Sequence, residues 1–376
     1  MPNNKTRKKR IIVLVSNDLT HDQRVKKITG TLHEMGFDIL LLGRKLKTSI
    51  AFERPYPYKR LRLFFTKGAL FYAMLNLRFF IFLLFHRADI ILANDLDTLL
   101  PAYLVSRLKG STVVYDSHEY FTEAAGLTGR NFQKKVWLII EEWIFPKVKI
   151  KYTVNESIAK IYREKYHTTV GVVRNIPPMN KLTNIQSRKE LGLPEDKKII
   201  LLQGAYIDYD RGAKDVAMAM KYVENALFLI IGTGQEIPIV KQLIKDEKLE
   251  DKVWVLPKMP FEELMQYTAN VDLGLSVDKP LHLNYTLSLP NKLFDYIQAG
   301  IPLLTSNLPE LARVQNKHHI GLMLENHNPK HIAEKINEAL FSNQREEWKK
   351  NLKIAAQEYH WEKEQEVIQE LYKELL

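Results

Sequence analysis

The chain has 376 residues, more than one hydrophobic core comfortably serves, so two domains are expected. It contains no cysteine, which excludes disulfides and thiolate metal sites and fits a reducing cytoplasm. The net charge of +11 is uneven, because residues 1–180 hold 30 Lys and Arg against 15 Asp and Glu, whereas the remainder holds 25 against 29. A basic first half attracts anionic lipid, phosphate-bearing substrates or nucleic acid, or is simply a solvated surface. No nucleic-acid-binding motif accompanies the charge, so nucleic acid is not expected as a partner.

Short β-branched runs alternate with helical patterns in the first half. The runs are continuously apolar, as in parallel strands that are covered on both faces. Strands are predicted over 10–15, 37–42, 89–93, 111–115, 151–154 and 170–173, with helices over 23–35 and 98–108. The first run is too short for the core of a signal peptide, so secretion is not expected. The pattern predicts a Rossmann-like domain, which we bound at residues 1–180.

The window from Ala69 to Phe85 is the most apolar in the chain. Asn76 and Arg78 interrupt it, and it falls short of the roughly 20 residues of a spanning helix, so a transmembrane segment is not expected. Two alternatives remain. The segment is either a buried or partly exposed helix of the domain, or a helix that lies in the interface of a bilayer.

Polar segments follow the predicted strands, at the sheet edge where doubly wound domains bind ligands. Asp18 and His21 lie in the first such loop, which lacks the glycines of a dinucleotide fingerprint, so an NAD site is not expected. Asp22, in the same loop, is equally suited to cap the following helix. The segment 94–97 contains a D-x-D pattern, but Asp97 precedes a helix and can cap it, so no metal is required.

His118 follows the strand predicted over 111–115 and is followed by Glu119. An imidazole at this edge can form a hydrogen bond with a sugar hydroxyl or a phosphate oxygen near neutral pH. A structural histidine is the alternative. Glu119 is suited either to orient His118 or to contact an acceptor.

A second series of strands begins after a polar connection that ends near residue 188. Strands are predicted over 198–203, 227–231, 253–256, 271–275 and 301–305. This series predicts a second Rossmann-like domain over residues 181–360, and two doubly wound domains facing each other across a cleft. The tail, residues 361–376, has the Glu- and Lys-rich amphipathic pattern of a helix.

Two loops of the second half have the composition of ligand-binding turns. Gly204 ends the first strand, and Arg211 then precedes a helix start, so its guanidinium is expected near free backbone N–H groups and an anionic diphosphate. A surface arginine is the alternative. Gly232-Thr-Gly234 ends another strand, where glycine lets the backbone approach a ligand or merely closes the connection to a helix.

The segment from Leu289 to Leu304 describes a helix whose first turn faces an anion. Pro290 suits the first turn, Asn291 can cap, and the free N–H groups with the helix dipole favour phosphate. Asp295 lies one turn further on the same face, where a carboxylate can accept both hydroxyl protons of a ribose. The order of these residues predicts a site for a nucleoside diphosphate.

Pro290-Asn-Lys-Leu-Phe-Asp-Tyr-Ile-Gln-Ala-Gly-Ile-Pro302 resembles the donor-site segment of family 4 glycosyltransferases (glycosyl transferases group 1), which usually reads P-x-K-x-x-E-Y-x-A-x-G-x-P. It departs from that pattern at Asp295, where the family has Glu, and at Leu287, where an earlier Glu would fall. The loop before Gly212 is also similar, without the second basic residue expected near Ala205. The resemblance covers most of the chain, and it is strongest over 203–309.

This resemblance implies an α/β chain of the B-type two-domain fold, with the donor on the second domain, the acceptor on the first, and the final helix crossing back to the first. The implied reaction moves a sugar from a nucleotide-diphosphate sugar to a hydroxyl acceptor, with retention and without metal or other cofactor. The resemblance implies that His118 and Arg211 take part in the chemistry. The implied donor-binding residues are Gly204, Arg211, Gly234, Asn291, Lys292, Leu293 and Asp295, and the implied acceptor-binding residues are Asp18, His21 and Glu119.

The basic first half agrees with the lipid-linked or polymeric acceptors that bacterial members often use. We therefore expect cell-surface glycan synthesis (polysaccharide or lipopolysaccharide) in the cytoplasm or at the inner face of the plasma membrane, with a glycan or lipid-linked acceptor and an anionic membrane surface as partners. Two alternatives stay open. One is a nucleotide-sugar 2-epimerase of the same fold, and the other is a non-enzymatic protein that binds anionic surfaces.

Overall fold

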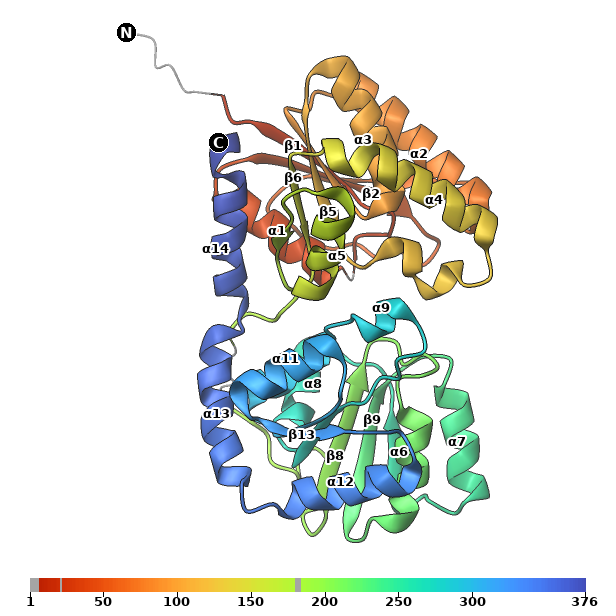
Figure 1. Cartoon of the computed structure of the whole chain (residues 1–376), viewed down its shortest axis with the longest axis vertical. Coiled ribbons are helices and arrows are strands. Elements are labelled where there is room, and N and C mark those ends of the chain that lie inside the picture. The colour runs from red at the N-terminus through yellow and green to blue at the C-terminus, as the bar shows by residue number, and fades with distance from the viewer. Residues whose placement is uncertain (1–6, 21, 180–183) are drawn as a thin grey trace. The chain divides into compact units, whose positions relative to one another are not determined.

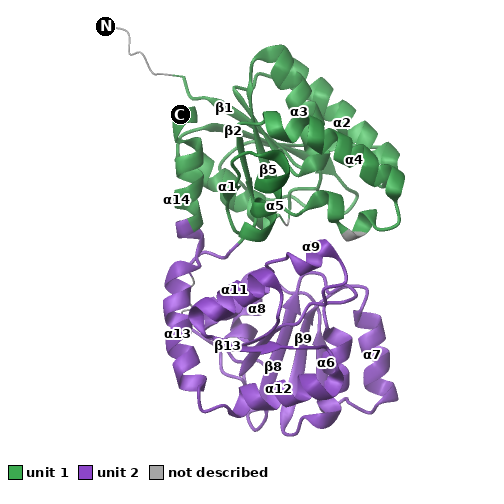
Figure 2. Cartoon of the chain, in the orientation of Figure 1, with its two compact units in different colours: residues 1–175, 364–376 green, residues 176–363 purple. Residues whose placement is uncertain are grey.

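The computed structural model describes residues 7–20, 22–179 and 184–376, and these form two units (Figure 2). Unit 1 comprises residues 1–175 and 364–376, and unit 2 comprises residues 176–363. The sequence analysis places the corresponding boundaries at residues 180 and 360. Each unit contains a parallel sheet with helices beside it, so the predicted α/β class with two Rossmann-like domains is confirmed.

The described part of unit 1 contains a seven-stranded parallel sheet in the order β3-β2-β1-β4-β5-β6-β7. The central strands were predicted because they are apolar throughout, and β1 and β4 are indeed almost fully buried. The edge strand β3 was not predicted, because its sequence Tyr-Lys-Arg-Leu-Arg is mostly charged. The strands are β1 (Arg10–Leu14), β2 (Asp38–Lys45), β3 (Tyr58–Arg62), β4 (Ile90–Asn94), β5 (Thr112–Ser117), β6 (Ile150–Thr153) and β7 (Gly171–Val172).

Five α-helices connect these strands in the described part of residues 1–175. Helices α2, α3 and α4 lie beside one another (Figure 1), with the rings of Tyr72 and Trp137 5.2 Å apart and those of Tyr103 and Trp143 5.6 Å apart. These edge-to-face pairs join α2 to α4 and α3 to α4. The helices are α1 (Gln23–Glu34), α2 (Gly68–Phe85), α3 (Leu96–Lys109), α4 (Asn131–Ile144) and α5 (Glu156–Tyr166).

The last helix, α14 (Trp361–Tyr372), leaves unit 2 and packs on unit 1. Glu364 accepts hydrogen bonds from the backbone N–H of Arg174 at 2.6 Å and from its guanidinium at 2.9 Å. The hydroxyl of the buried Tyr372 lies 3.3 Å from that of Tyr152 in β6. The prediction that the C-terminal helix crosses back to the first domain is therefore confirmed.

Unit 2 contains a six-stranded parallel sheet in the order β10-β9-β8-β11-β12-β13. Apolar clusters cover both of its faces, as the continuously apolar strands require. The edge strand β13 was not predicted. The strands are β8 (Lys198–Gly204), β9 (Ala226–Gly232), β10 (Val253–Leu256), β11 (Leu273–Ser276), β12 (Leu303–Ser306) and β13 (Gly321–Leu324). The helices are α6 (Ala213–Ala219), α7 (Ile237–Asp246), α8 (Phe261–Thr268), α9 (Leu283–Thr286), α10 (Asn291–Ala299), α11 (Pro309–His318), α12 (Pro329–Phe341) and α13 (Arg345–Glu358).

The order of the strands reverses once in each sheet. In unit 1 the reversal lies between β1 and β4, and in unit 2 it lies between β8 and β11. Loops that leave neighbouring strands at such a point diverge and open a crevice beyond the carboxyl ends of the strands. Of the residues singled out in the sequence, Asp18 follows β1 and Arg211 follows β8, whereas His118 follows the neighbouring strand β5.

Candidate functional site

In unit 2, two cations from separate loops converge on one buried carboxylate. Arg211, in the loop after β8, places Nη1 2.9 Å from Oδ1 of Asp278, and Lys292, in the first turn of α10, places Nζ 3.6 Å from Oδ2. Asp278 follows β11 and has no exposed surface. Burial alone would raise the pKa of Asp278, but Lys292 and Arg211 outweigh it and hold that pKa below its usual value. The carboxylate is therefore ionised at neutral pH.

Two cations on one carboxylate leave one positive charge uncompensated within this group. Arg211 also lies over the ring of Tyr285, with 4.2 Å between the guanidinium carbon and the ring centroid, which fixes the plane of the guanidinium. Burial lowers the pKa of Lys292 despite the attraction of Asp278. This arrangement can hold an anion against Arg211 and Lys292. Sequence analysis missed Asp278, although an acidic residue just after a buried apolar strand is a signal of a strand-end site.

Helix α10 begins one residue earlier than a cap at Asn291 would require. Pro290 occupies the N-cap position in an extended conformation, and Asn291 is the first helical residue, so the prediction that Asn291 caps the helix is wrong. The physical reason is that the fixed φ of proline, here −67° with ψ at 139°, suits the extended residue before the helix. The first N–H groups of α10 still lack partners within the helix and point towards its N-terminal side, where Lys292 lies. The side chain of Leu293 belongs to the core, and its backbone N–H donates to the carbonyl of Pro290 at 3.1 Å, so the structure does not support the predicted donor contact of Leu293.

Asp295 lies one turn into α10, as predicted, and only 8% of it is exposed. Its Oδ2 accepts a hydrogen bond of 2.9 Å from Gln203, the residue before Gly204 in β8. Gln203 in turn accepts a hydrogen bond of 2.7 Å from the hydroxyl of Thr268. The carboxylate is therefore held in one orientation at the end of β8.

The glycines at the ends of β8 and β9 bring two loops of the protein together. A Cβ on Gly232 would lie 2.0 Å from the carbonyl oxygen of Gly204, and one on Gly234, whose φ is +145°, would lie 2.0 Å from that of Ile207. The close backbone approach at Gly232 and Gly234 thus serves the protein's own loop over residues 204–207. A side chain at either position would separate the two loops.

Glu236 lies at the start of the helix that follows Arg211, where the sequence predicted a bound diphosphate. Its carboxylate accepts a hydrogen bond of 3.2 Å from the backbone N–H of Ala213, the first residue of the helix after Arg211. Burial raises the pKa of Glu236 to about 6. The helix start at Ala213 is therefore met by a carboxylate of the chain itself, and the guanidinium of Arg211 turns towards Asp278 instead.

In unit 1, His118 lies among three polar side chains at the carboxyl ends of β4 and β5. Its Nε2 is 3.2 Å from Asn94 and 3.2 Å from Asp116, and its Nδ1 is 3.5 Å from Asp95. Asp95 also accepts a hydrogen bond of 2.8 Å from the backbone N–H of His118. Asp97 lies in the first turn of α3 and not at its N-cap, which is Asp95, so the expected cap by Asp97 is wrong.

Asp95 has an uncommon backbone conformation, with φ at 60° and ψ at 167°. This region strains any residue that has a Cβ, and such strain usually persists where the surrounding structure needs that particular geometry. The conformation lets the side chain of Asp95 meet both the backbone and the ring of His118. Sequence analysis had assigned no role to Asp95.

The carboxylates around His118 favour its protonated form. Burial lowers the pKa of His118, but Asp95 and Asp116 raise it by more, to about 9. Burial raises the pKa of Asp95 to about 8 although His118 opposes this shift. At neutral pH His118 is thus an imidazolium, suited to donate a hydrogen bond or to stabilise negative charge.

The guanidinium of Arg24 binds the carboxylate of Asp116 in this cluster. It is almost fully buried and donates to Asp116 through Nε at 3.0 Å and Nη2 at 2.6 Å, and to the carbonyl of Val173 at 2.6 Å. Asp116 thereby connects Arg24 with His118. The side chain of Arg24 thus joins α1 to β5 and to the residue after β7.

The other residues of the first loop have local roles. Asp22 accepts a hydrogen bond of 3.0 Å from the N–H of Val25 and so caps α1, which confirms that alternative. Asp18 accepts from the backbone and hydroxyl of Thr20 and from the hydroxyl of Ser49. Despite partial burial these bonds lower the pKa of Asp18. His21 lies outside the described residues.

Glu119 lies close enough to Asp95 and Asp97 for its negative charge to contribute to the raised pKa values of both carboxyl groups. The pKa of Asp97 rises to about 6, and burial is the main cause. The carboxylates that contact the His118 ring are those of Asp95 and Asp116.

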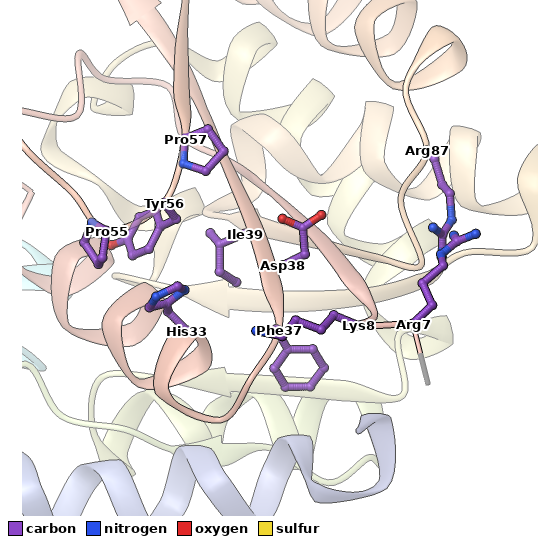
Figure 3. A pocket seen from close by; sticks show the side chains of 10 residues that line it. All are labelled: Arg7, Lys8, His33, Phe37, Asp38, Ile39, Pro55, Tyr56, Pro57 and Arg87. Carbon is purple, nitrogen blue, oxygen red and sulfur yellow. The ribbon is translucent and has the colours of Figure 1, made fainter. Parts of the chain in front are cut away.

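A separate pocket of about 370 Å³ lies in unit 1 (Figure 3). Asp38 and Ile39, which line it, begin β2, so it opens at the amino edge of the sheet, whereas His118 lies at the carboxyl edge. The pocket is thus distinct from the His118 cluster. Within residues 7–20, 22–179 and 184–376, no three His, Cys, Asp or Glu side chains are grouped as a metal site.

Residues 184–359 match the model of the family described as glycosyl transferases group 1. A comparison with curated proteins found no match. Among solved structures, a sucrose-phosphate synthase from Thermosynechococcus elongatus is 15% identical, with a TM-score of 0.78 over 98% of this chain and 99% of that one. HepE from Anabaena, solved with UDP and glucose, is 14% identical, with a TM-score of 0.75 over 97% of this chain and 100% of that one.

WaaG, a glycosyltransferase involved in lipopolysaccharide biosynthesis, is 15% identical to the chain, with a TM-score of 0.72 over 96% of this chain and 99% of that one. At such identities these structures establish the two-domain fold, and the family match covers residues 184–359, which lie in unit 2. The chain is therefore a glycosyltransferase with the B-type two-domain fold, and its residues 184–359 match the group 1 family.

Proposed function

We propose that the enzyme uses unit 2 to hold the nucleoside diphosphate of its donor and unit 1 to hold a hydroxyl acceptor, and that it retains the anomeric configuration. The observation that carries this proposal is the convergence of Arg211 and Lys292 on Asp278 beside the start of α10. The donor diphosphate would lie against these two cations and the first N–H groups of the helix. Asp295, held by Gln203, would accept the ribose hydroxyls.

The departing diphosphate gains negative charge as the bond to the sugar breaks. Cations that are already in place stabilise this charge without reorganising, which is often the largest contribution to catalysis. Arg211 is held by Asp278 and by Tyr285, so its position is fixed before substrate arrives. Two fixed cations supply the charge that a divalent metal supplies in other transferases, and on this ground we propose that the reaction needs no metal.

In unit 1, the imidazolium of His118 would bind the donor sugar or the β-phosphate. It would give up its contact with one of the two neighbouring carboxylates to do so. Asp18 and Glu119 would contact the acceptor. We further propose that the acceptor is a growing cell-surface glycan, free or lipid-linked, and that the enzyme works in the cytoplasm or at the inner face of the plasma membrane. The fold that this chain shares with WaaG makes such an acceptor reasonable, because WaaG is involved in lipopolysaccharide biosynthesis.

Thermal-shift measurements with UDP, GDP, ADP and their glucose or mannose derivatives would test the donor site. A ligand that binds the native state raises the midpoint of unfolding, and UDP is the first candidate because HepE was solved with it. One nucleotide should stabilise wild-type protein, and Arg211→Ala should remove most of that shift. If no diphosphate stabilises the protein, the proposal is wrong.

The reaction itself is tested by NMR of the products after incubation with the selected donor and candidate acceptors, with and without EDTA. A glycoside with the anomeric configuration of the donor, formed equally with EDTA, is expected. An inverted product, or one that requires added metal, would contradict the respective part of the proposal. Release of free nucleoside diphosphate with an epimerised sugar would instead favour the 2-epimerase alternative.

A further inference from the structure

Helix α2 exposes an apolar stripe, where a surface helix normally exposes polar residues. The residues that face outward recur every three or four positions and are Leu70, Ala73, Leu77, Ile81 and Phe85, with Arg78 the charged residue among them. Phe85 is 81% exposed and Leu77 57% exposed. By length and composition α2 could cross a membrane, yet only 28% of it is buried within the protein. The apolar side chains on the outer face of α2 are therefore not covered by other parts of the protein that the structure describes.

The opposite face of α2 is fixed to unit 1. Phe71, Leu75 and Phe79 are buried, and Asn76 donates a hydrogen bond of 2.9 Å to the carbonyl of Asp97 in α3. At the other end, the ammonium of Lys109 donates to carbonyl oxygens of the last turn of α2. A helix held in this way cannot enter a bilayer lengthwise without losing part of the core. It can lie flat on one, with only the outer stripe inserted.

Exposed apolar residues continue beside α2. Phe64 and Phe65, just before the helix, are 89% and 43% exposed. Helix α4, which contacts α2 through Trp137 and Tyr72, exposes a second stripe at helical spacing. That stripe consists of Phe132, Val136, Ile139 and Trp143. We call these residues together with the α2 stripe the α2–α4 surface.

The charge around the α2–α4 surface is positive. No Asp or Glu lies between Glu53 and Asp89, whereas Arg62 and Lys67 lie in that interval and are exposed; Arg87, also exposed, pairs with Asp89 at 2.7 Å. Beside α4, Lys147 lies over the ring of Trp143 with its ammonium 5.3 Å from the centroid. Aromatic and aliphatic side chains with a cationic border fit the interface of an anionic bilayer, where the chains insert and the cations meet lipid phosphates.

From these observations we propose that the α2–α4 surface docks the enzyme on anionic lipid bilayers, with α2 lying in the plane of the interface. A bilayer fits better than a folded partner protein, because the exposed face of α2 offers almost no hydrogen-bonding groups along a helix of about 27 Å. The proposal rests on exposure and charge in unit 1 and holds whatever the donor or the acceptor.

Flotation with vesicles tests the docking. The full chain should float with vesicles that contain phosphatidylglycerol and phosphatidylcholine, and much less with phosphatidylcholine alone or at high salt. The variant Leu77→Ser, Ile81→Ser, Phe85→Ser should lower the partition coefficient at least about tenfold, because three inserted side chains are lost. These positions are exposed, so thermal unfolding and nucleotide binding should stay as in the wild type.

A matched control carries Ile239→Ser, Phe341→Ser and Ile354→Ser on unit 2, at positions that are 40%, 65% and 65% exposed. It should float like the wild type. An equal loss in the control, unchanged flotation of the α2 variant, or no flotation of the wild type with anionic vesicles would each overturn the proposal. Self-association through α2, seen as a dimer by light scattering that the α2 variant abolishes without any change in flotation, would overturn it in favour of a second copy of the chain.

The absence of cysteine in the sequence permits a second test by site-specific labelling. An environment-sensitive dye on Leu77→Cys should shift to shorter emission wavelength on addition of anionic vesicles and be quenched by brominated lipid. The same dye on Phe341→Cys should show neither change. A dye at position 77 that stays in water while the protein floats would show that another surface binds the lipid, and the proposal would be wrong.

Discussion

The charge clusters at the carboxyl edges of the two sheets differ in their balance of cations and carboxylates. In unit 2, Arg211 and Lys292 share the single carboxylate of Asp278. In unit 1, the ring of His118 faces both Asp95 and Asp116, and Asp116 is also bound by the buried Arg24. The unit 2 cluster thus has two cations for one carboxylate, whereas in the unit 1 cluster two carboxylates face two cations, the imidazolium of His118 and Arg24. The same fold and the same edge therefore create two different electrostatic environments.

This difference indicates a division of labour. A surplus of fixed cations is suited to a diphosphate, which carries negative charge before the reaction and gains more during it. A histidine that carboxylates keep protonated is suited to donate to an oxygen, and the carboxylates themselves are suited to hydroxyl groups. Variants that change one charged group at a time separate the roles of the two edges.

Arg211→Ala should have the largest effect on turnover, a loss of about 10²–10³ in kcat/KM, because a fixed cation that faces the leaving diphosphate is removed. Arg211→Lys should retain part of the activity. Steady-state kinetics with the preferred donor measure this, and Lys279→Ala is the control, because that nearby cation pairs with Asp215 at 2.6 Å instead of with Asp278. Equal losses in both variants would show that general charge, and not the Asp278 cluster, matters.

His118→Gln should lower kcat/KM by about 10²-fold, because glutamine keeps a donor group but cannot carry the proton. The effect should fall on turnover with the nucleotide affinity nearly unchanged, since the nucleotide would lie on unit 2. Calorimetric titration with the nucleoside diphosphate separates the two quantities. His33→Gln, a change in α1 beside Tyr56, is the control and should be neutral. A large loss of nucleotide affinity in His118→Gln would remove the proposed division between the units.

Asp295→Ala should weaken nucleotide binding by about 1–3 kcal/mol, because a charge-assisted hydrogen bond to the ribose would be lost. Gln203 would lose its partner as well, so part of the effect would be structural. Comparison of a ribonucleotide with its 2′,3′-dideoxy analogue distinguishes these causes, since Asp295→Ala should bind the two alike. Asp246→Ala, on the exposed surface of α7, is the control. If the variant still prefers the ribonucleotide, the ribose assignment is wrong.

The sequence was sufficient to predict the central strands and several residues of both edges. Continuous apolar runs such as those of β1, β4 and β9 are read directly as buried parallel strands. The edge strand β3 could not be recognised in the same way, because only one side of it pairs and its charged residues resemble a loop. The sequence could thus predict the strands that are buried on both faces, but not the partly exposed edge strand.

The partners of the site residues were less predictable. Arg211 and Lys292 could be selected from their loops, but Asp278 becomes their partner only when β11 is placed beside β8. The same holds for Asp95, which meets His118 because β4 pairs with β5. Long-range pairing decides these contacts, and local pattern does not contain it. A shift of one residue at the start of α10 similarly depended on the conformation of Pro290.

Asp95→Asn should have the smallest effect at neutral pH and the clearest effect on the pH profile. The pKa of His118 is raised to about 9, so an activity that needs the imidazolium is present below that value and is lost as the pH rises through it. Asparagine has the size and shape of aspartate, so it adds no backbone strain beyond that already present at position 95, and it can still accept from the backbone N–H of His118, but it cannot carry the negative charge that Asp95 can place beside the ring. The pKa of His118 should fall, and the alkaline limb of kcat/KM should move to lower pH.

Kinetics between pH 6 and 10, combined with NMR of the imidazole protons of His118, check this expectation directly. Asp97→Asn is the matched control, since Asp97 feels the charge of His118 whereas the carboxylates that contact the ring are those of Asp95 and Asp116. A pKa of His118 that stays unchanged in Asp95→Asn would mean that Asp116 alone keeps the ring charged. The strained backbone at Asp95 would then have to serve the loop between β4 and α3, and the contrast between the two edges would rest on Asp116 and Arg24.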